Sequence, residues 1–280
     1  MPCACSNDAW STGMAMSDAA SEPARAAPLQ PWRWRLGSLA VLLALWIAAT
    51  GSGMVSGVFL PTPADLWDAG LELVRDGYKD RPLLDHIGLS LLRVLGGFGL
   101  GALAGTALGL LMGWRGWIDA LFTPFIEFLR PLPQLAYLVL LIIWLGIGET
   151  PKIVLLFLAA LPVAAVAARD GVRRVQFVRV AAARSLGASE WQIFRHVVLP
   201  SALPDIVIGA RLALGIVYGT LIAAEIIAGS SGIGWMILDA GRFLRSDQVF
   251  VGVLVIGLMG VALDRLLVLV EHRIVHWAGR

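Results

Sequence analysis

Six long apolar runs dominate the pattern of hydrophobic and polar positions along the chain. They cover residues 36–56, 89–113, 132–148, 152–168, 203–229 and 249–270. A helix needs about 20 apolar residues to cross the hydrocarbon layer of a bilayer. The runs are continuous rather than alternating, and in lipid only helices and closed barrels satisfy their backbone hydrogen bonds. We therefore expect an all-α integral membrane protein with six transmembrane helices.

Two shorter amphipathic stretches separate some of these runs. Prolines at positions 61 and 63 favour an extended entry, and residues 65–74 then place apolar side chains on one side of a short helix. A second amphipathic stretch follows residues 232–235 and reaches Leu244. Both are typical of helices that lie in the membrane interface, and both are equally suited to cover the outer mouth of a pathway.

The composition agrees with a membrane protein. Hydrophobic residues make up 58% of the chain and charged residues 15%, with a mean hydropathy of +0.78. Soluble domains carry about 25% charged residues, so a bilayer is the natural solvent for this chain. A formal net charge of +2 gives no indication of a nucleic-acid partner.

The basic residues set the expected orientation, because cytoplasmic segments of membrane proteins are enriched in Lys and Arg. With the N-terminus in the cytoplasm, the inner segments hold Arg25, Arg33, Arg35, Arg115, Arg130, Arg169, Arg173, Arg174, Arg179, Arg184, Arg195, Arg273 and Arg280. The outer segments then hold only Arg75, Lys79, Arg81, Lys152, Arg242 and Arg245. This bias predicts that both termini lie inside.

The first 30 residues are rich in Ser, Ala and Pro and are expected to form a disordered cytoplasmic leader. Its two cysteines, Cys3 and Cys5, are interpreted as incidental rather than as a metal or redox site. Residues 31–58 are expected to hold the first transmembrane helix and residues 59–85 a periplasmic segment. Basic residues followed by an apolar run resemble a signal peptide, but the long leader and the later runs favour an uncleaved anchor.

Glycines recur at every fourth position in the second apolar run. Such a stripe lets two helix backbones approach closely in lipid. It indicates tight packing, either within the subunit or against a second copy of the chain. The stripe consists of Gly97, Gly101, Gly105, Gly109 and Gly113.

A few ionisable residues fall at membrane depth, where a charge is costly and marks a site by default. Arg211, Asp264 and Arg265 are expected to reach the headgroups from the ends of their runs. Arg93 and Glu225 both fall near outer ends, where they either pair or line an outer vestibule.

The segment between the fourth and fifth runs, residues 169–202, has the pattern of two short helices joined by a turn. An apolar stripe predicts the first helix; its members are Val172, Val175, Val178, Ala182 and Leu186. Gly187 fits a left-handed C-terminal cap. Ser189 and Gln192 fit a capping box that begins a second helix, which is expected to end at Leu199 and Pro200. The pattern suits a docking surface for a cytoplasmic partner and equally a plain solvated loop.

This segment resembles the signature loop of binding-protein-dependent ABC importer permeases, which reads Glu-Ala-Ala, three residues, Gly, nine residues, Ile, one residue, Leu-Pro. The residues that match are Ala182, Ala183, Gly187, Leu199 and Pro200. Val197 stands in place of the isoleucine. Ala181 stands in place of the glutamate, so an anionic contact of the family is missing here.

The resemblance covers roughly residues 60–275, and residues 130–133, 146–152, 183–189 and 223–227 look like the branch for taurine, alkanesulfonates and nitrate. It implies the type I ABC importer permease fold, with residues 86–272 as its transmembrane domain, in the cell inner membrane. It also implies a permease homodimer, two cytoplasmic ATPase subunits and a periplasmic substrate-binding protein. The implied ATPase-coupling residues are Ala182, Ala183, Leu186, Gly187, Ala188, Ser189, Glu190, Leu199 and Pro200.

The chain contains no G-x-x-x-x-G-K-[ST] phosphate loop, so ATP and Mg²⁺ are expected on a partner subunit. We expect no cofactor, metal site or catalytic residue in this chain, and hence no enzyme. The histidines are spread over different segments, which argues against an intramembrane enzyme; they are His86, His196, His272 and His276.

The expected function is translocation of a small solute, taurine or another sulfonate, with nitrate or a different small solute as the alternative within the branch. A rival from another class is an autonomous secondary transporter, which needs ionisable groups near the bilayer midplane. Hydroxyl, amide and aromatic groups would suit an anion pathway, although bonding between helices explains the same side chains equally well. The candidates are Gln134, Tyr137, Tyr218, Thr220 and, at the outer end, Glu225.

Overall fold

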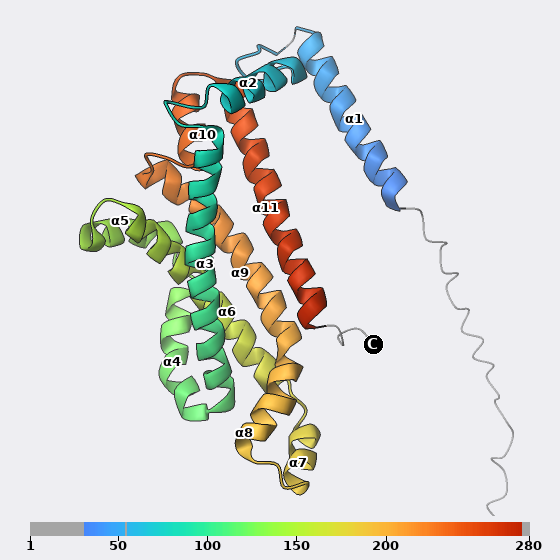
Figure 1. Ribbon diagram of the computed structural model, residues 1–280, viewed down its shortest axis with the longest axis vertical. Helices are drawn as coiled ribbons and strands as arrows, with labels where there is room; N and C mark the ends of the chain where they lie inside the picture. Colours follow the sequence, from blue (N-terminus) through green and yellow to red (C-terminus); the bar gives the residue numbers. More distant parts are fainter. Residues whose placement is uncertain (1–30, 54, 276–280) are drawn as a thin grey trace, which may run out of the picture. The chain divides into compact units, whose positions relative to one another are not determined.

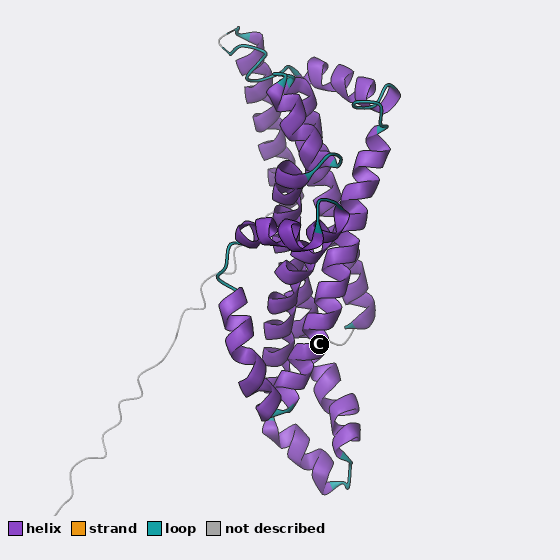
Figure 2. Ribbon diagram, turned by 90° about the vertical axis from the view of Figure 1, so that its left-hand side faces the viewer, coloured by secondary structure: helices purple, strands orange, loops and turns teal. Residues whose placement is uncertain are grey.

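The computed structural model describes residues 31–53 and 55–275, so the expected leader and its two cysteines lie outside the described residues. Its regular elements within these ranges are helices, as Figure 2 shows. The first, α1 (Pro31–Gly51), has an apolar stretch of 16 residues, Leu36–Gly51. It lies within residues 31–58, the range expected for the first transmembrane helix, and Gly53 follows it with a φ of 69°.

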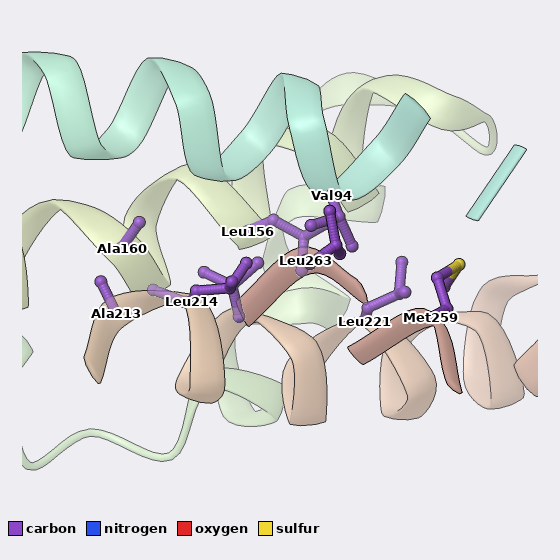
Figure 3. Close-up of a cluster of buried hydrophobic side chains, with 10 residues drawn as sticks. Val94, Leu156, Ala160, Ala213, Leu214, Leu221, Met259 and Leu263 are labelled. Carbon is purple, nitrogen blue, oxygen red and sulfur yellow. The ribbon is translucent and has the colours of Figure 1, made fainter. Parts of the chain in front are cut away.

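Four long helices form the core of the rest of the chain (Figure 1). They are α3 (Leu83–Trp114), α6 (Glu149–Arg173), α9 (Leu199–Ala228) and α11 (Ser246–Ile274). Each is long and apolar enough to cross a membrane, which matches four of the six expected spans. A buried cluster joins them, and Figure 3 shows its side chains; Val94, Leu156, Leu221 and Leu263 contribute one residue from each helix.

The glycine stripe of α3 packs within the subunit, against α6. A Cβ atom added to Gly97, Gly101, Gly105, Gly109 or Gly113 would come within 3.0 Å of α6 atoms. Each glycine faces the carbonyl oxygen of the residue 56 positions further on, from Ile153 to Arg169. Because this offset is constant over four helical turns, α3 and α6 run parallel in fixed register.

Two parallel helices need a return segment between them, and that segment differs from the expected third span. The sequence predicted one helix over 132–148, but the structure has α4 (Gly116–Leu129) and α5 (Gln134–Leu145), bent by 100° relative to each other. Pro131 and Pro133 lie at the bend, where a proline lacks the N–H that would continue a helix. Helix α5 thus lies within the expected range, whereas α4 is an additional 14-residue apolar helix that was not expected.

The remaining long helices alternate in direction. Gly209 of α9 packs on Ala167 of α6 while Gly171 of α6 packs on Ala202 of α9, so these two helices are antiparallel. The bundle thus has two ends. We call the end that carries α7 (Phe177–Ser185) and α8 (Glu190–Ile193) the loop end. The other, which carries α2 (Pro63–Arg75) and α10 (Ile233–Arg242), is the α10 end.

Helices α2 and α10 match the two amphipathic stretches of the sequence. Thr62 and Asp65 form a capping box at the start of α2, and the hydrogen bonds from the backbone and hydroxyl of Thr62 lower the pKa of Asp65. Leu66, Ala69 and Leu73 form the buried side of α2. This buried face shows that α2 packs onto the bundle.

Arg211 does not simply reach outward from the end of its helix, as the sequence suggested. Its guanidinium lies 3.1 Å from the Asp264 carboxylate and 3.6 Å from that of Glu271, so it ties α9 to α11. Both partners are only partly exposed, at 49% and 30% of their side chains. Arg211 is therefore paired with carboxylates of the same subunit.

The close contact between α3 and α6 predicts opposite effects for two glycine substitutions. Gly109→Ala should lower the melting temperature of the detergent-purified protein, because its new methyl group meets backbone atoms of Ala165 that cannot move aside. Overpacking of this kind costs about 1–3 kcal/mol. Gly99→Ala is the matched control, since nothing lies within 4 Å of its added Cβ and alanine favours a helix over glycine by about 1 kcal/mol. Equal melting temperatures for the two variants would contradict the assigned packing.

Candidate functional site

The first helix at the loop end does not have the apolar stripe that the sequence predicted for it. Val172 belongs to the last turn of α6, and the chain breaks before α7 begins at Phe177. Val178 and Leu186 point outward, with 73% and 88% of their surface exposed. The side chains that face the bundle are instead Val180 and Ala183. The predicted first helix was thus placed too early, because its apolar spacing continued that of α6.

The turn after α7 has the predicted left-handed cap. Gly187 has a φ of 80°, a conformation that costs a residue with a Cβ atom roughly 1–2 kcal/mol. Its N–H donates to the carbonyl oxygen of Arg184 at 2.9 Å, and the N–H of Ala188 donates to that of Ala183 at 3.1 Å. These two bonds form a Schellman motif, which closes the last carbonyls of α7.

Helix α8 begins as predicted but does not end as predicted. The backbone N–H of Ser189 donates to the Gln192 side chain at 2.8 Å, and the Ser189 hydroxyl accepts from the Gln192 N–H, so the capping box is present. Pro200 was expected to stop the helix. Instead a π-helical turn, Phe194–Val198, leads straight into α9.

The widened turn explains how the chain passes the proline. Pro200 has no N–H to donate, and a π-helical turn relaxes the backbone just before that position. Residues Glu190–Ala228 consequently form one helical segment of 39 residues. Helix α8 is thereby continuous with a helix that is long enough to cross a membrane.

Apolar side chains are exposed on both sides of the turn. Phe177, Leu186 and Trp191 are 77%, 88% and 66% exposed, and α7 has no buried residue. Beneath them the pair rests on a buried cluster of Val172, Ile193, Val198 and Ala202. The turn is therefore held rigidly from below and presents apolar groups outward.

Charges and hollows complete the surface of the loop end. Arg184 and Glu190 form an exposed ion pair across the turn at 2.8 Å. A pocket of about 450 Å³ lies between α7 and the π-helical turn, next to Leu186 and His196. A second, of about 370 Å³, lies between Trp114 and Trp191. Such hollows suit side chains of a docked protein.

Two of the predicted pathway residues form hydrogen bonds within the subunit. Tyr218 donates to the carbonyl oxygen of Ile256 at 2.5 Å, and Thr220 donates to that of Ile216 at 2.8 Å, so both hydroxyls are bonded within the chain. Gln134 begins α5, and Tyr137 packs beside its buried side. Their role in a pathway stays a prediction.

Glu225 belongs to a buried ionic cluster at the α10 end. Its carboxylate lies 2.5 Å from the Arg93 guanidinium, so these two residues pair. Arg93 also binds the Glu149 carboxylate through Nε at 2.5 Å and Nη2 at 2.8 Å, and Ser231 through two further bonds. Lys152 is 2.9 Å from the same Glu149 carboxylate. The cluster joins α3, α6, α9 and the loop before α10.

Sequence reasoning missed Glu149 and Lys152 as parts of this cluster. Lys152 was counted as an outer basic residue, but it is 2% exposed. One available signal was the run Gly146-Ile147-Gly148, where a helix could begin with Glu149 at its N-terminus. The parallel register of α3 and α6, which no local pattern reveals, brings Glu149 to Arg93.

The surface above the cluster carries its own ion pair. Tyr78 donates to Asp239 at 2.6 Å and Lys79 lies 2.5 Å from the same carboxylate. Burial raises the pKa of Asp239, but the hydrogen bonds from Lys79 and Tyr78 outweigh it and lower that pKa below its usual range. Burial and the neighbouring carboxylate raise the pKa of Tyr78. Both groups therefore keep their ordinary charge near neutral pH and fasten α10 to the loop at Tyr78.

Comparison of the sequence with known protein families gives a match that agrees with a bundle of long helices. The model of the "binding-protein-dependent transport system inner membrane component" family matches residues 97–276. The chain belongs to this family. It is therefore a multi-pass inner-membrane permease of an ABC importer for a small solute.

Relatives with curated names cover most of the permease. The taurine transport system permease protein TauC of Escherichia coli is 40% identical over 257 residues, which is 89% of this chain and 94% of the relative. The putative aliphatic sulfonates transport permease protein SsuC of Bacillus subtilis is 35% identical, covering 87% of this chain and 88% of the relative. The nitrate import permease protein NrtB of Synechocystis is 30% identical, covering 85% and 87%.

A solved structure shows the same fold. An inward-facing structure of the MetNI methionine ABC transporter aligns with a TM-score of 0.55 at 22% identity, covering 66% of this chain and 94% of that one. Together with the family match, this confirms the type I ABC importer permease fold. Among the described residues, helices suited to spanning number four, or five with the bent pair.

The left-handed turn of the permease generates a prediction about backbone order. Gly187→Val should make the amides of residues 187 and 188 exchange hydrogen roughly tenfold faster, because a cost of about 1.4 kcal/mol changes an equilibrium tenfold. Gly187→Asn is the matched control, since asparagine tolerates this conformation. Nothing lies within 4 Å of a Cβ at this position, so no steric clash contributes, and any fall in melting temperature should reflect backbone strain and be confined to Gly187→Val. Equal exchange in both variants would contradict the role assigned to the φ of Gly187.

Proposed function

We propose that this permease imports a small sulfonate, taurine or a close analogue, as one half of a permease homodimer driven by two ATPase subunits. The support for the substrate is the 40% identity to a taurine permease over most of both chains. Relatives named for aliphatic sulfonates and for nitrate make other small anions the alternative. Uptake of radiolabelled taurine and nitrate by the complete importer distinguishes them.

The proposed topology has six spans with both termini in the cytoplasm. α1 would be the first span, followed by α3, the bent pair α4–α5, α6, α9 and α11. The loop end is then cytoplasmic, in agreement with its basic residues Arg115, Arg169, Arg173, Arg174, Arg179, Arg184 and Arg195. The α10 end would face the periplasm and receive solute from the binding protein.

The observation that carries the proposed mechanism is the rigid turn with its continuous connection to α9. Each ATPase subunit would bind the turn around Leu186, which includes Gly187, Ala188 and Ser189. Closure of the ATPase pair on ATP and Mg²⁺ moves the turn as a rigid body, and α9 moves with it because no flexible linker separates α8 from α9. The bundle then opens toward the α10 end, and hydrolysis reverses the movement.

The signature glutamate is replaced by Ala181, so the contact with the ATPase would rest on other groups. Leu186 supplies apolar surface, and Glu190 supplies a carboxylate nine positions later. Glu190 is 52% exposed and already held by Arg184. This ion pair orients the carboxylate without burying it.

Charge placed on the exposed turn should uncouple the permease without unfolding it. Leu186→Asp is expected to abolish co-purification of the ATPase and solute uptake, because an apolar contact is replaced by a carboxylate that must lose its water on docking. The melting temperature of the variant should equal that of the wild type, since Leu186 is 88% exposed.

A matched substitution at the other end controls for a general effect of added charge. Trp67→Asp changes a side chain of α2 that is 70% exposed, and it should leave ATPase co-purification intact. Retained co-purification in Leu186→Asp would overturn the docking role of the turn. Solute uptake by reconstituted permease without any ATPase would instead support the rival secondary transporter.

A further inference from the structure

Two buried cations point at one half-exposed carboxylate in the ionic cluster of the α10 end. The side chains of Arg93 and Lys152 are each 2% exposed, whereas that of Glu149 is 49% exposed. Three N–H groups bind the Glu149 carboxylate: Arg93 Nε at 2.5 Å, Arg93 Nη2 at 2.8 Å and Lys152 Nζ at 2.9 Å. The donors are thus fixed inside the protein, while the anion that they hold is at its surface.

The second carboxylate of the cluster is a permanent part of the structure. Glu225 is 0% exposed and accepts hydrogen bonds from Ser90 at 2.7 Å, from the Gly234 N–H at 2.8 Å and from Arg93 at 2.5 Å. It balances one of the two buried positive charges. The other is balanced only by Glu149, so the cluster without Glu149 would hold one uncompensated positive charge that attracts an anion.

The loop that leads to Glu149, residues 146–148, has open space around it. Gly146 has a φ of 81°, and no neighbour lies within 4 Å of a Cβ built on Gly146 or Gly148. Ile147 between them is 93% exposed. Glu149 is also the first residue of α6, where the helix dipole favours a negative charge. A different anion would gain the same attraction.

In the proposed topology, the cluster lies where a solute delivered from outside would enter. Gly113 marks the loop-end side of α3, and Arg93 lies 20 residues before it in the same helix. At 1.5 Å per residue the two levels are about 30 Å apart, close to the thickness of the hydrocarbon layer. Arg93 and Lys152 therefore lie at the far boundary of the membrane, opposite the turn that docks the ATPase.

We propose that Arg93 and Lys152 form an entry site for the sulfonate group of the solute, and that Glu149 occupies this site as an internal substitute anion between transport events. The inference rests on the proposed import of sulfonates, for which it names the contacting residues. A sulfonate carries one negative charge and three acceptor oxygens, and the Arg93 fork binds such an anion through two parallel N–H bonds. No net charge enters or leaves the cluster when one anion replaces the other.

Competition from the Glu149 carboxylate lowers the affinity of the site for an external anion. A low affinity suits a transport site, which must release its solute. A competing group on the same chain acts at a high effective concentration, which is in the millimolar range for short flexible linkers. An external sulfonate at lower concentration does not displace Glu149. The high local concentration delivered by a docked binding protein does, and the returning carboxylate then helps to release the solute.

The test measures anion binding to the full-length permease purified in detergent, with methanesulfonate as the probe. Melting temperatures are recorded over a range of sodium methanesulfonate at constant ionic strength, with dimethyl sulfone as the uncharged probe of similar shape. Glu149→Gln keeps the shape of the side chain and removes the competing charge. It should respond to methanesulfonate at a concentration roughly tenfold lower than the wild type does, and not to dimethyl sulfone.

Two further variants make the comparison specific. Glu72→Gln removes another carboxylate paired with an arginine at the same end, but its partner Arg245 is 43% exposed and also bound to Asp247. This variant should not gain a response. Glu149→Gln combined with Lys152→Met removes one of the two cations and should lose the response of the single variant. If Glu149→Gln cannot be purified, Glu149→Asp, one methylene shorter, should show a smaller gain.

An unchanged response in Glu149→Gln, or an equal gain in Glu72→Gln, would show that Glu149 is a structural tie only. Taurine uptake by the wild-type importer tests the proposed function separately. Absent taurine uptake together with a methanesulfonate response in Glu149→Gln would overturn the substrate but keep the anion site. Taurine uptake without that response would overturn the anion site but keep the function.

Discussion

The direct contact between the backbones of α3 and α6 is the constraint on which the rest of the permease depends. Leucine against leucine gains little over leucine against lipid, so membrane helices associate where small residues allow close approach. Five glycines spread over residues 97–113 place α3 on α6 in one register. That register decides that Arg93 meets Glu149 at one end and that Gly113 meets Val172 at the other.

The fixed pair of α3 and α6 leaves α9 as the helix that connects the two ends of the bundle. The antiparallel helix α9 packs on α6 and reaches both ends of the bundle, because it continues α8 at the loop end and carries Glu225 at the α10 end. A displacement of the turn at Gly187 is therefore applied to a segment that ends in the ionic cluster. The two ends are coupled through one continuous helix rather than through a chain of loops.

Local patterns predicted the features of the permease that local forces determine. The glycine cap at Gly187 and the capping box at Ser189 depend on neighbouring residues, and both were predictable. The bend at Pro131 and the π-helical turn before Pro200 were not, because a proline indicates a break but not whether the helix resumes. The helix over residues 116–129 was not expected either, since it lies between two of the apolar runs.

The ionic cluster could be predicted only in part, since it depends on the packing of distant segments. Arg93 and Glu225 were recognisable because charged residues in an apolar run need partners. Their pairing with Glu149 and Lys152 requires the parallel register, which the glycine stripe permits but does not specify. A buried arginine with two carboxylates would stay negatively charged overall without a second cation. Lys152 supplies that charge, and its burial beside a half-exposed Glu149 makes the cluster able to exchange one anion for another.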